Sequence, residues 1–287
     1  MTDVTLIFLN YNTPDWIAKA LQSLKKQYLD QTKLKADVVV VDNASTDNSV
    51  ALISQKFPWV TVIKAAENKG FAAGNNLALK RVKSRYAMLL NSDVEFSPHS
   101  NLDELVFYMD ARPEIGVCSP KVLLSNGKLD PASHRGEPTI WASLTYFSGL
   151  EKLFPHSPLF AQYHQTYKDL DQIHLVDACS GAAMMVRTSA MEKVGYLDER
   201  FFMYAEDLDW CRRFRDHGFQ VVYHPEVIVI HHKYKSGRGH QDTQLSKKTS
   251  SHFYQTMLQY FDKHYQDRYP FFVRWAVQGF VWWKTRS

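Results

Sequence analysis

Met88-Leu89-Leu90-Asn91-Ser92-Asp93-Val94 is the stretch of sequence that decides the fold. Its apolar half predicts a buried strand, and this strand ends abruptly in an amide, a hydroxyl and a carboxylate. In an open α/β sheet, ligands bind at the edge where the carboxyl ends of the strands meet. Asp93 is therefore placed to give one hard oxygen ligand to a divalent metal ion that also holds a diphosphate.

The same pattern, an apolar strand with polar side chains at its carboxyl end, precedes this stretch three times. Strands are predicted at residues 4–9, 36–42 and 60–63, and the polar residues that end or follow them are Asn10, Asp42 and Asn68. A helix is predicted after each strand. Because strands that alternate with helices form parallel sheets, the first hundred residues predict a doubly wound α/β fold.

The chain is less regular beyond residue 100. Residues 125–176 are aromatic and contain Pro and His, and we predict loops and short helices there, over the active-site face. The later predicted elements are strands at 182–187, 219–224 and 227–230 and helices at 188–194, 206–217, 249–265 and 271–283. We divide the chain into a catalytic domain at 1–240, with halves 1–100 and 101–240, and a helical C-terminal extension at 241–287.

Composition narrows the function classes. The 34 basic and 30 acidic residues leave a balance too small to indicate nucleic-acid binding. Cys118, Cys179 and Cys211 lie far apart, which fits a reducing compartment and no zinc knuckle. We find no amino-terminal signal and no run of about 18 apolar residues, so we expect a cytoplasmic protein. The weak GxxxG at Gly70–Gly74 lacks the dinucleotide fingerprint and the phosphate-loop lysine, which disfavours both of those nucleotide-binding modes.

Four segments together resemble glycosyltransferase family 2, and most closely its rhamnosyltransferase-like branch. They are Val41–Asp47, Asn68–Asn76, Leu90–Asp93 and Phe202–Asp209, and His231-His232 follows at the family's late histidine position. The resemblance spans Val4 to about His232. It implies a GT-A fold, which is a Rossmann-like, mostly parallel sheet flanked by helices. It also implies an inverting mechanism, a nucleotide-sugar donor and Mn²⁺ or Mg²⁺.

The resemblance implies roles for particular residues. The donor-binding residues are Asn10, Tyr11, Asn12, Asp42, Asn68, Gly70, Asn91, Ser92 and Asp93. Among them, Asp42 matches the residue that hydrogen-bonds the pyrimidine base. Asn91 stands where many members have the first carboxylate of Asp-x-Asp, which leaves Asp93 as the metal ligand of this segment.

The second half of the chain supplies the remaining roles. Asp207 matches the general base, Glu206 its neighbour, and His231 the distal metal ligand. Inversion requires a base that takes the acceptor hydroxyl's proton on the face opposite the leaving group. The Gln/Arg-x-x-Arg-Trp block of processive synthases is absent after Asp207, so transfer of a single sugar is expected.

Structural roles are open for several of these residues. Asp42 and Asp93 also suit turns that follow strands, and Glu206 and Asp207 suit the amino terminus of a helix electrostatically. Asp209 is expected to be structural or substrate-orienting and not the base.

We expect metal-assisted transfer of rhamnose from dTDP-rhamnose to a hydroxyl of a cell-surface glycan or a lipid-linked saccharide. The alternatives are transfer of galactose, glucose or galactofuranose from a UDP donor, and a non-catalytic domain that binds nucleotide or glycan. A sugar nucleotidyltransferase is disfavoured because Asn10-Tyr11-Asn12 is not a glycine- and basic-rich loop.

Two basic segments have alternative interpretations. Arg187, Lys233, Lys235 and Arg238 form a solvated face, or the loop that contains Gly237 forms a lid over phosphates. The aromatic segment 271–283, with flanking Arg and Lys, either packs on its own domain or attaches peripherally to the cytoplasmic face of the membrane.

Overall fold

The structure is a computed structural model, and it describes residues 2–233 and 243–286. The predicted lid at Lys235, Gly237 and Arg238 lies outside the described residues. Side chains are described for residues 2–233 and 253–286.

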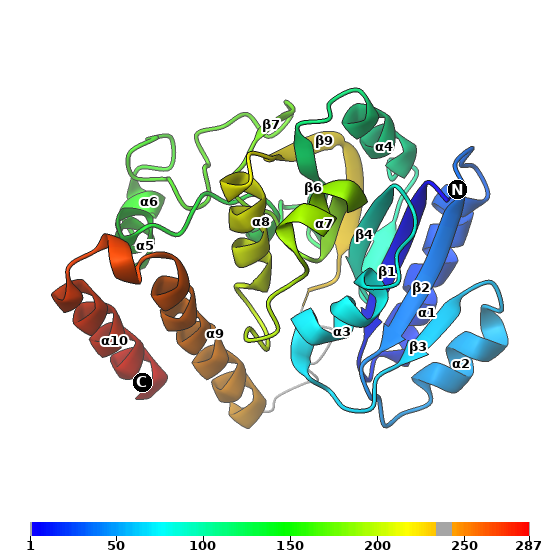
Figure 1. Ribbon diagram of the computed structural model, residues 1–287, viewed down its shortest axis with the longest axis horizontal. Helices are drawn as coiled ribbons and strands as arrows, with labels where there is room; N and C mark the ends of the chain where they lie inside the picture. Colours follow the sequence, from blue (N-terminus) through cyan, green and yellow to red (C-terminus); the bar gives the residue numbers. More distant parts are fainter. Residues whose placement is uncertain (1, 234–242, 287) are drawn as a thin grey trace.

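A single mixed sheet runs through the described part of the chain (Figure 1). Its strand order is β3-β2-β1-β4-β8-β6-β9-β5, and β7 pairs with β9. The strands are β1 Val4–Asn10, β2 Ala36–Asp42, β3 Thr61–Lys64, β4 Tyr86–Asn91, β5 Val94–Phe96, β6 Ile115–Leu124, β7 His174–Leu175, β8 Ala183–Arg187 and β9 Gln220–His231. Strands β1 to β4 are parallel, which confirms the doubly wound first half. Strand β8 runs antiparallel to both β4 and β6, and β6 runs parallel to β9.

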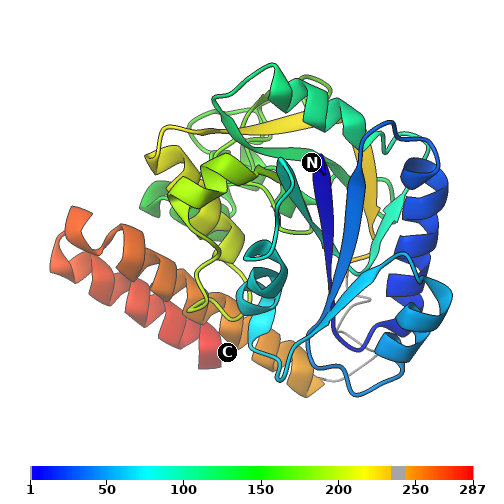
Figure 2. The ribbon, with the colours of Figure 1, turned by 45° about the vertical axis from the view of Figure 1, so that its right-hand side comes forward.

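Helices cover both faces of this sheet (Figures 1 and 2). They are α1 Pro14–Leu24, α2 Ser49–Lys56, α3 Gly70–Leu79, α4 Leu102–Asp110, α5 Ile140–Ser148, α6 Leu150–Leu153, α7 Thr188–Val194, α8 Glu206–Asp216, α9 Thr243–His264 and α10 Phe271–Arg286. Apolar side chains of α1, α2 and α4 form one core cluster, and those of α3, α7 and α8 form another. Because successive strand residues face opposite ways, Leu6 and Phe8 of β1 join the first cluster and Ile7 joins the second.

The two strands predicted at 219–224 and 227–230 are in fact one strand, β9. A register shift against β6 occurs between Pro120 and Lys121, opposite the segment that contains Pro225. Proline cannot donate to the ladder, so it is tolerated at this irregularity, and the sequence pattern breaks there although the strand continues. No element was predicted for residues 94–124, where the structure has β5, α4 and β6.

The C-terminal helices α9 and α10 form an antiparallel hairpin beside α8 (Figure 1). Helix α9 begins at Thr243, earlier than the predicted start at residue 249. Its Tyr260 and Phe261 are buried in the same core cluster as α8, as the helical spacing of apolar residues predicted. None of the described helices is both long enough and apolar enough to cross a membrane.

Candidate active site

A cavity of about 840 Å³ lies at the carboxyl-terminal edge of β1 and β4, and residues Glu206 to Leu208, at the start of α8, form part of its wall. The predicted site residues that line it are Tyr11, Asn68, Gly70, Asn91, Ser92, Glu206, Asp207 and His231. Asn10, Asn12, Asp42 and Asp93 are not in the described lining, and they act on it through their neighbours. Eight of the twelve predicted site residues therefore lie in the cavity wall, and their roles stay predictions.

Asn10 and Asp42 hold the first two loops together. They are paired in register at the ends of β1 and β2, and Asn10 Nδ2 donates to Asp42 Oδ1 at 2.9 Å. The backbone N–H of Ser45 donates to the other carboxylate oxygen at 3.0 Å, and that of Asn12 donates to Ser45 Oγ at 2.9 Å. Both interpretations of Asp42 are compatible with this geometry, since the buried carboxylate fixes its own loop and the next residue, Asn43, lines the cavity.

Gly70 brings α3 against the segment that leads into α8. Its φ is +92°, and an added Cβ would lie 2.1 Å from the carbonyl oxygen of Phe202, so only glycine fits. The N–H of Phe71 donates to this same oxygen at 2.8 Å. Asn68 accepts from the N–H of Gly70 and from Asn43 Nδ2, both at 2.9 Å. The loop is thus ordered around one amide, and Asn43, which the sequence analysis did not identify, joins the cavity wall.

Asp93 and His231 lie side by side because β5 pairs antiparallel with the end of β9. Asp93 Oδ1 is 3.3 Å from His231 Nε2, and both side chains are almost fully buried. The other ring nitrogen of His231 donates to Asp130 Oδ2 at 2.9 Å. Burial disfavours the charged imidazole, but the hydrogen bonds to Asp130 and Asp93 outweigh it and raise the pKa of His231 to about 9. Lys233 completes the group by donating to Asp130 Oδ1.

Asp207 is held by an ion pair that the sequence analysis did not predict. Arg135 Nη2 donates to Asp207 Oδ2 at 2.7 Å, and the N–H of Leu208 donates to Oδ1 at 2.7 Å. Arg135 comes from the loop after β6, where its backbone bonds to Ala178 beside β8. Both charged side chains are mostly buried, so the pair interacts strongly and orients the carboxylate in the cavity wall.

Glu206 is buried next to Asp207 at the first position of α8. Desolvation, and then the negative charge of Asp207, raise the pKa of Glu206 to about 8. The two preceding residues, Tyr204 and Ala205, have φ of +72° and +64°. Left-handed conformations at residues other than glycine are costly and cluster at functional sites. At neutral pH Glu206 is therefore protonated beside the carboxylate of Asp207.

This environment predicts a pH-dependent effect of Glu206→Gln. Between the usual Glu pKa of 4.5 and about 8, the folded protein holds a proton that the unfolded chain has released. Stability therefore falls as the pH rises through this window, by up to about 1.4 kcal/mol per pH unit. Glutamine removes that loss, so the variant's free energy of unfolding should exceed the wild-type value by more at pH 8 than at pH 5. Urea denaturation at both pH values measures it, with exposed Glu192→Gln as control. A pH-independent difference would contradict the raised pKa.

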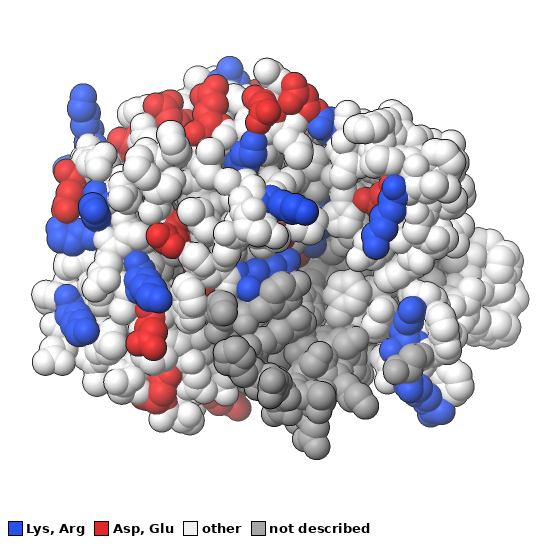
Figure 3. Space-filling view, turned by 180° about the vertical axis from the view of Figure 1, so that it is seen from behind, with Lys and Arg blue, Asp and Glu red and all other residues white. Residues whose placement is uncertain are grey.

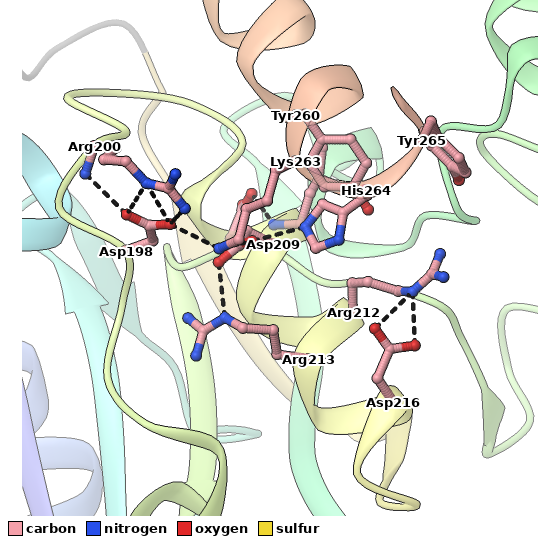
Figure 4. A network of polar contacts seen from close by, with 12 residues as sticks. Asp198, Arg200, Asp209, Arg212, Arg213, Asp216, Tyr260, Lys263, His264 and Tyr265 are labelled. Carbon is pink, nitrogen blue, oxygen red and sulfur yellow. Dashed lines mark hydrogen bonds and ion pairs between the residues drawn. The ribbon is translucent and has the colours of Figure 1, made fainter. Parts of the chain in front are cut away.

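Asp209 points away from the cavity and into an ion network with α9 (Figure 4). Its carboxylate accepts from Arg213 Nε at 2.9 Å and from His264 Nε2 at 2.8 Å, and Lys263 Nζ lies 2.5 Å away. The side chain of Asp209 is fully buried. These contacts agree with the structural role that was expected for Asp209, and they leave Glu206 and Asp207 as the carboxylates of α8 that line the cavity.

A sheet edge where parallel strands end, a buried carboxylate pair and an Asp-His pair whose histidine lines the same cavity are typical of α/β enzymes that bind their ligands at the carboxyl ends of strands. The model of the family described as glycosyl transferase family 2 matches residues 5–194, and that of glycosyl transferase family group 2 matches residues 130–286. The chain belongs to glycosyl transferase family 2 and is a glycosyltransferase.

Relatives and solved structures agree with this class. The chain is 26% identical to the N-acetylglucosaminyl-diphospho-decaprenol L-rhamnosyltransferase of Mycobacterium tuberculosis, over 97% of this chain and 91% of that one. It is 27% identical to the rhamnosyltransferase WbbL of Escherichia coli, over 82% and 85%. The mannosyltransferase PcManGT of Pyrobaculum calidifontis, solved with GDP-Man and Mn²⁺, aligns with a TM-score of 0.61 at 18% identity, over 97% and 69%. This last likeness shows that the fold is of the GT-A type.

Proposed function

We propose that this enzyme transfers a single sugar, with inversion, from a nucleotide donor to a hydroxyl of a cell-surface glycan or a lipid-linked saccharide. The observation that carries the proposal is that Asp207 and His231 line the same cavity, although they come from α8 and from the end of β9. A base is thereby joined to a site suited to a metal and a diphosphate. A domain that only binds nucleotide or glycan needs no such base.

Asp207 acts as the general base in this proposal. It takes the proton of the acceptor hydroxyl while that oxygen attacks the sugar carbon and the bond to the nucleoside diphosphate breaks. Arg135 fixes the direction of this carboxylate through the 2.7 Å hydrogen bond to Oδ2. Glu206, with its raised pKa, is the protonated neighbour that adds no second negative charge beside the base at neutral pH.

Asp93 and His231 are suited to hold Mn²⁺ or Mg²⁺. Two adjacent ligands of one octahedral ion lie about 3 Å apart, and the oxygen and nitrogen here are 3.3 Å apart. A carboxylate on the second ring nitrogen, as Asp130 provides, is the usual partner of a metal-binding histidine. Within residues 2–233 and 243–286 no group of three or more His, Cys, Asp or Glu side chains is placed to hold an ion. Phosphate oxygens of the donor and water would therefore supply the remaining ligands. The ion would neutralise charge on the departing diphosphate.

The donor is dTDP-rhamnose in our proposal, because two relatives of nearly full length are rhamnosyltransferases by name. Calorimetry with dTDP-rhamnose, UDP-galactose, UDP-glucose, UDP-galactofuranose and GDP-mannose, each with and without Mn²⁺, tests it. We expect metal-dependent binding of dTDP-rhamnose and slow hydrolysis of it. If a UDP-sugar binds more tightly than dTDP-rhamnose, the proposed donor is wrong but the proposed mechanism stands. Binding of no donor under either condition would reject the enzyme mechanism in favour of the non-catalytic alternative.

The metal assignment predicts graded effects of two substitutions. His231→Ala removes a ligand, and Asp130→Asn removes only the carboxylate that orients it. Loss of such an outer partner typically costs 10–100-fold in metal affinity, so we expect about that loss for Asp130→Asn and a larger one for His231→Ala. Titration of Mn²⁺ in the presence of dTDP, followed by electron paramagnetic resonance, measures both without turnover. His232→Ala is the matched control. An unchanged Mn²⁺ affinity in His231→Ala would make His231 structural.

We also propose that the extension at 241–287 attaches the catalytic part, residues 1–240, to the cytoplasmic face of a membrane. Phe271, Trp275 and Trp282 of α10 are 69%, 64% and 56% exposed, and Arg274 and Arg286 lie on the same helix. Exposed aromatics with basic residues suit a lipid interface with anionic headgroups. The end of the molecule that carries α5 and α10, on the right of Figure 3, shows a mostly uncharged surface with an acidic and a basic side chain side by side, and further basic side chains at its lower edge. Unchanged sedimentation with anionic liposomes after truncation at Asp267 would refute this attachment.

A further inference from the structure

The cavity of the candidate active site has two ends of different chemistry. Asn43, Asn68 and Asn91 line it at the edge of the sheet. The other end lies between α5 and the α9–α10 hairpin, and we call it the apolar arm. Its lining residues are Leu144, Phe147, Met257, Val273, Val277 and Phe280. In Figures 1 and 2, α8, with Asp207 at its start, lies between the sheet and the helices that form this arm.

The walls of the apolar arm are held in place by contacts between the helices and loops that form them. Helix α9 is anchored to α8 by the network around Asp209, in which both Lys263 and His264 take part (Figure 4). Tyr260 and Tyr265 both donate to Glu137 Oε1 at 2.7 Å. On the opposite side, the rings of Phe147 in α5 and Phe280 in α10 are 4.9 Å apart. The arm is therefore bounded by helices that are fixed independently of any occupant.

The chemistry of the two ends selects an amphipathic ligand. A nucleotide sugar is polar throughout and matches the amides, the Asp93–His231 pair and the Asp207 end of the cavity. It leaves the aliphatic and aromatic arm unmatched. A hydrocarbon chain gains by leaving water for such a lining, and a hydroxyl-bearing head attached to it would stay near Asp207. The outward face of α10, with its exposed Trp275 and Trp282, is where such a chain would come from a lipid layer.

We propose that the apolar arm binds the proximal part of the hydrocarbon chain of a lipid-linked acceptor and so positions the acceptor hydroxyl at Asp207. This inference rests on the proposed function. It adds that the acceptor is a lipid and that the hydrocarbon chain of this lipid lies in the apolar arm. A free glycan in the same cavity would reach Asp207 without using Phe147, Met257 or Phe280.

Binding of hexyl, octyl and decyl phosphate to the full-length protein, below their micelle-forming concentrations, tests the arm directly. A buried methylene contributes a factor of about four in affinity, so we expect an increase on the order of 100-fold from hexyl to decyl phosphate. Ala276, an exposed residue in the cavity wall on α10, provides the blocking variant. Ala276→Trp should lower the affinity for decyl phosphate by at least about 10-fold. Gln278→Trp, which introduces the same side chain at an exposed position outside the lining, should leave this affinity unchanged.

Two further measurements separate the possible failures. Ser143→Phe narrows the arm from α5, so it should reproduce the effect of Ala276→Trp if either variant folds poorly. Replacing Trp275 and Trp282 by serine should leave decyl phosphate binding unchanged, and a loss there would place the chain on the outer surface and overturn the inference. If the affinity for alkyl phosphates does not depend on chain length while the protein still binds its sugar donor, only the inference about the apolar arm is overturned. If the wild-type protein binds no sugar donor, the proposed function itself is overturned.

Discussion

Asp207→Asn should lower the rate of sugar transfer by about 10³-fold, within the range that a positioned general base contributes. The asparagine has nearly the same shape and still fits beside Leu208 N–H, but it cannot accept the acceptor's proton. Donor affinity should change little, because the donor contacts that we propose lie on the Asn68 and Asp93 side of the cavity. Turnover and donor binding, measured on the same preparation by product formation and by calorimetry, check both halves of this prediction.

Asp207→Asn also leaves the Arg135 guanidinium buried without its counter-ion, and that costs stability. The double variant Asp207→Asn with Arg135→Met removes both charges and is the folded control, which should be just as inactive. Asp216→Asn, the same change at the other end of α8, should keep full activity, because this carboxylate is half exposed and contacts Arg212. If Asp207→Asn transfers sugar at more than a tenth of the wild-type rate, Asp207 is not the base, and Glu206 becomes the candidate for that role.

Asp209→Ala should destabilise the fold by about 3–5 kcal/mol, the usual cost of removing one partner from a buried ion cluster. Lys263, His264 and Arg213 all converge on this carboxylate, which is fully buried (Figure 4). Its loss leaves three cationic or potentially cationic groups facing one another between α8 and α9. We therefore expect α9 to separate from α8 first. Urea denaturation followed by circular dichroism gives the free energy of unfolding, and hydrogen exchange at residues 253–264 shows whether α9 opens.

Asp216→Ala is the matched control for this experiment, because Asp216, like Asp209, pairs with an arginine four residues away on α8. Its side chain is 48% exposed, so its loss should cost no more than about 1 kcal/mol. A destabilisation of Asp209→Ala that is equally small would mean that the ion cluster holds the hairpin only weakly.

The sequence alone predicted the elements whose signal is local. The β-branched run Ala36–Asp42 and the apolar run before Asn91 became strands within one residue of their predicted ends, because period and composition are read over a few neighbouring residues. Helix α8 ended at Asp216, one residue before the predicted end at 217, and Gly218 follows it in a left-handed conformation. The class of enzyme was also accessible, since the motifs that carry the resemblance are short and lie at strand ends.

Only the tertiary structure decided which distant side chains meet. Nothing near Arg135 in the sequence indicates that it pairs with Asp207, 72 residues later. The partnership of Asp130 with His231 across 101 residues has no local signal either. In both cases the pairing follows from strand order, because β6 lies between β8 and β9 and its exit loop is carried over the end of the sheet.

Asp207 and Asp209 show this division most clearly. The sequence places both at the start of one helix, two residues apart, with the same chemistry and the same attraction to its amino terminus. The fold turns one toward the cavity and Arg135, and buries the other against Lys263 and His264. Residues two apart on a helix point in directions about 200° apart, so their surroundings are set by what packs on each face. The local sequence thus determined that acids are placed at this helix start, and long-range packing decided which of them lines the cavity.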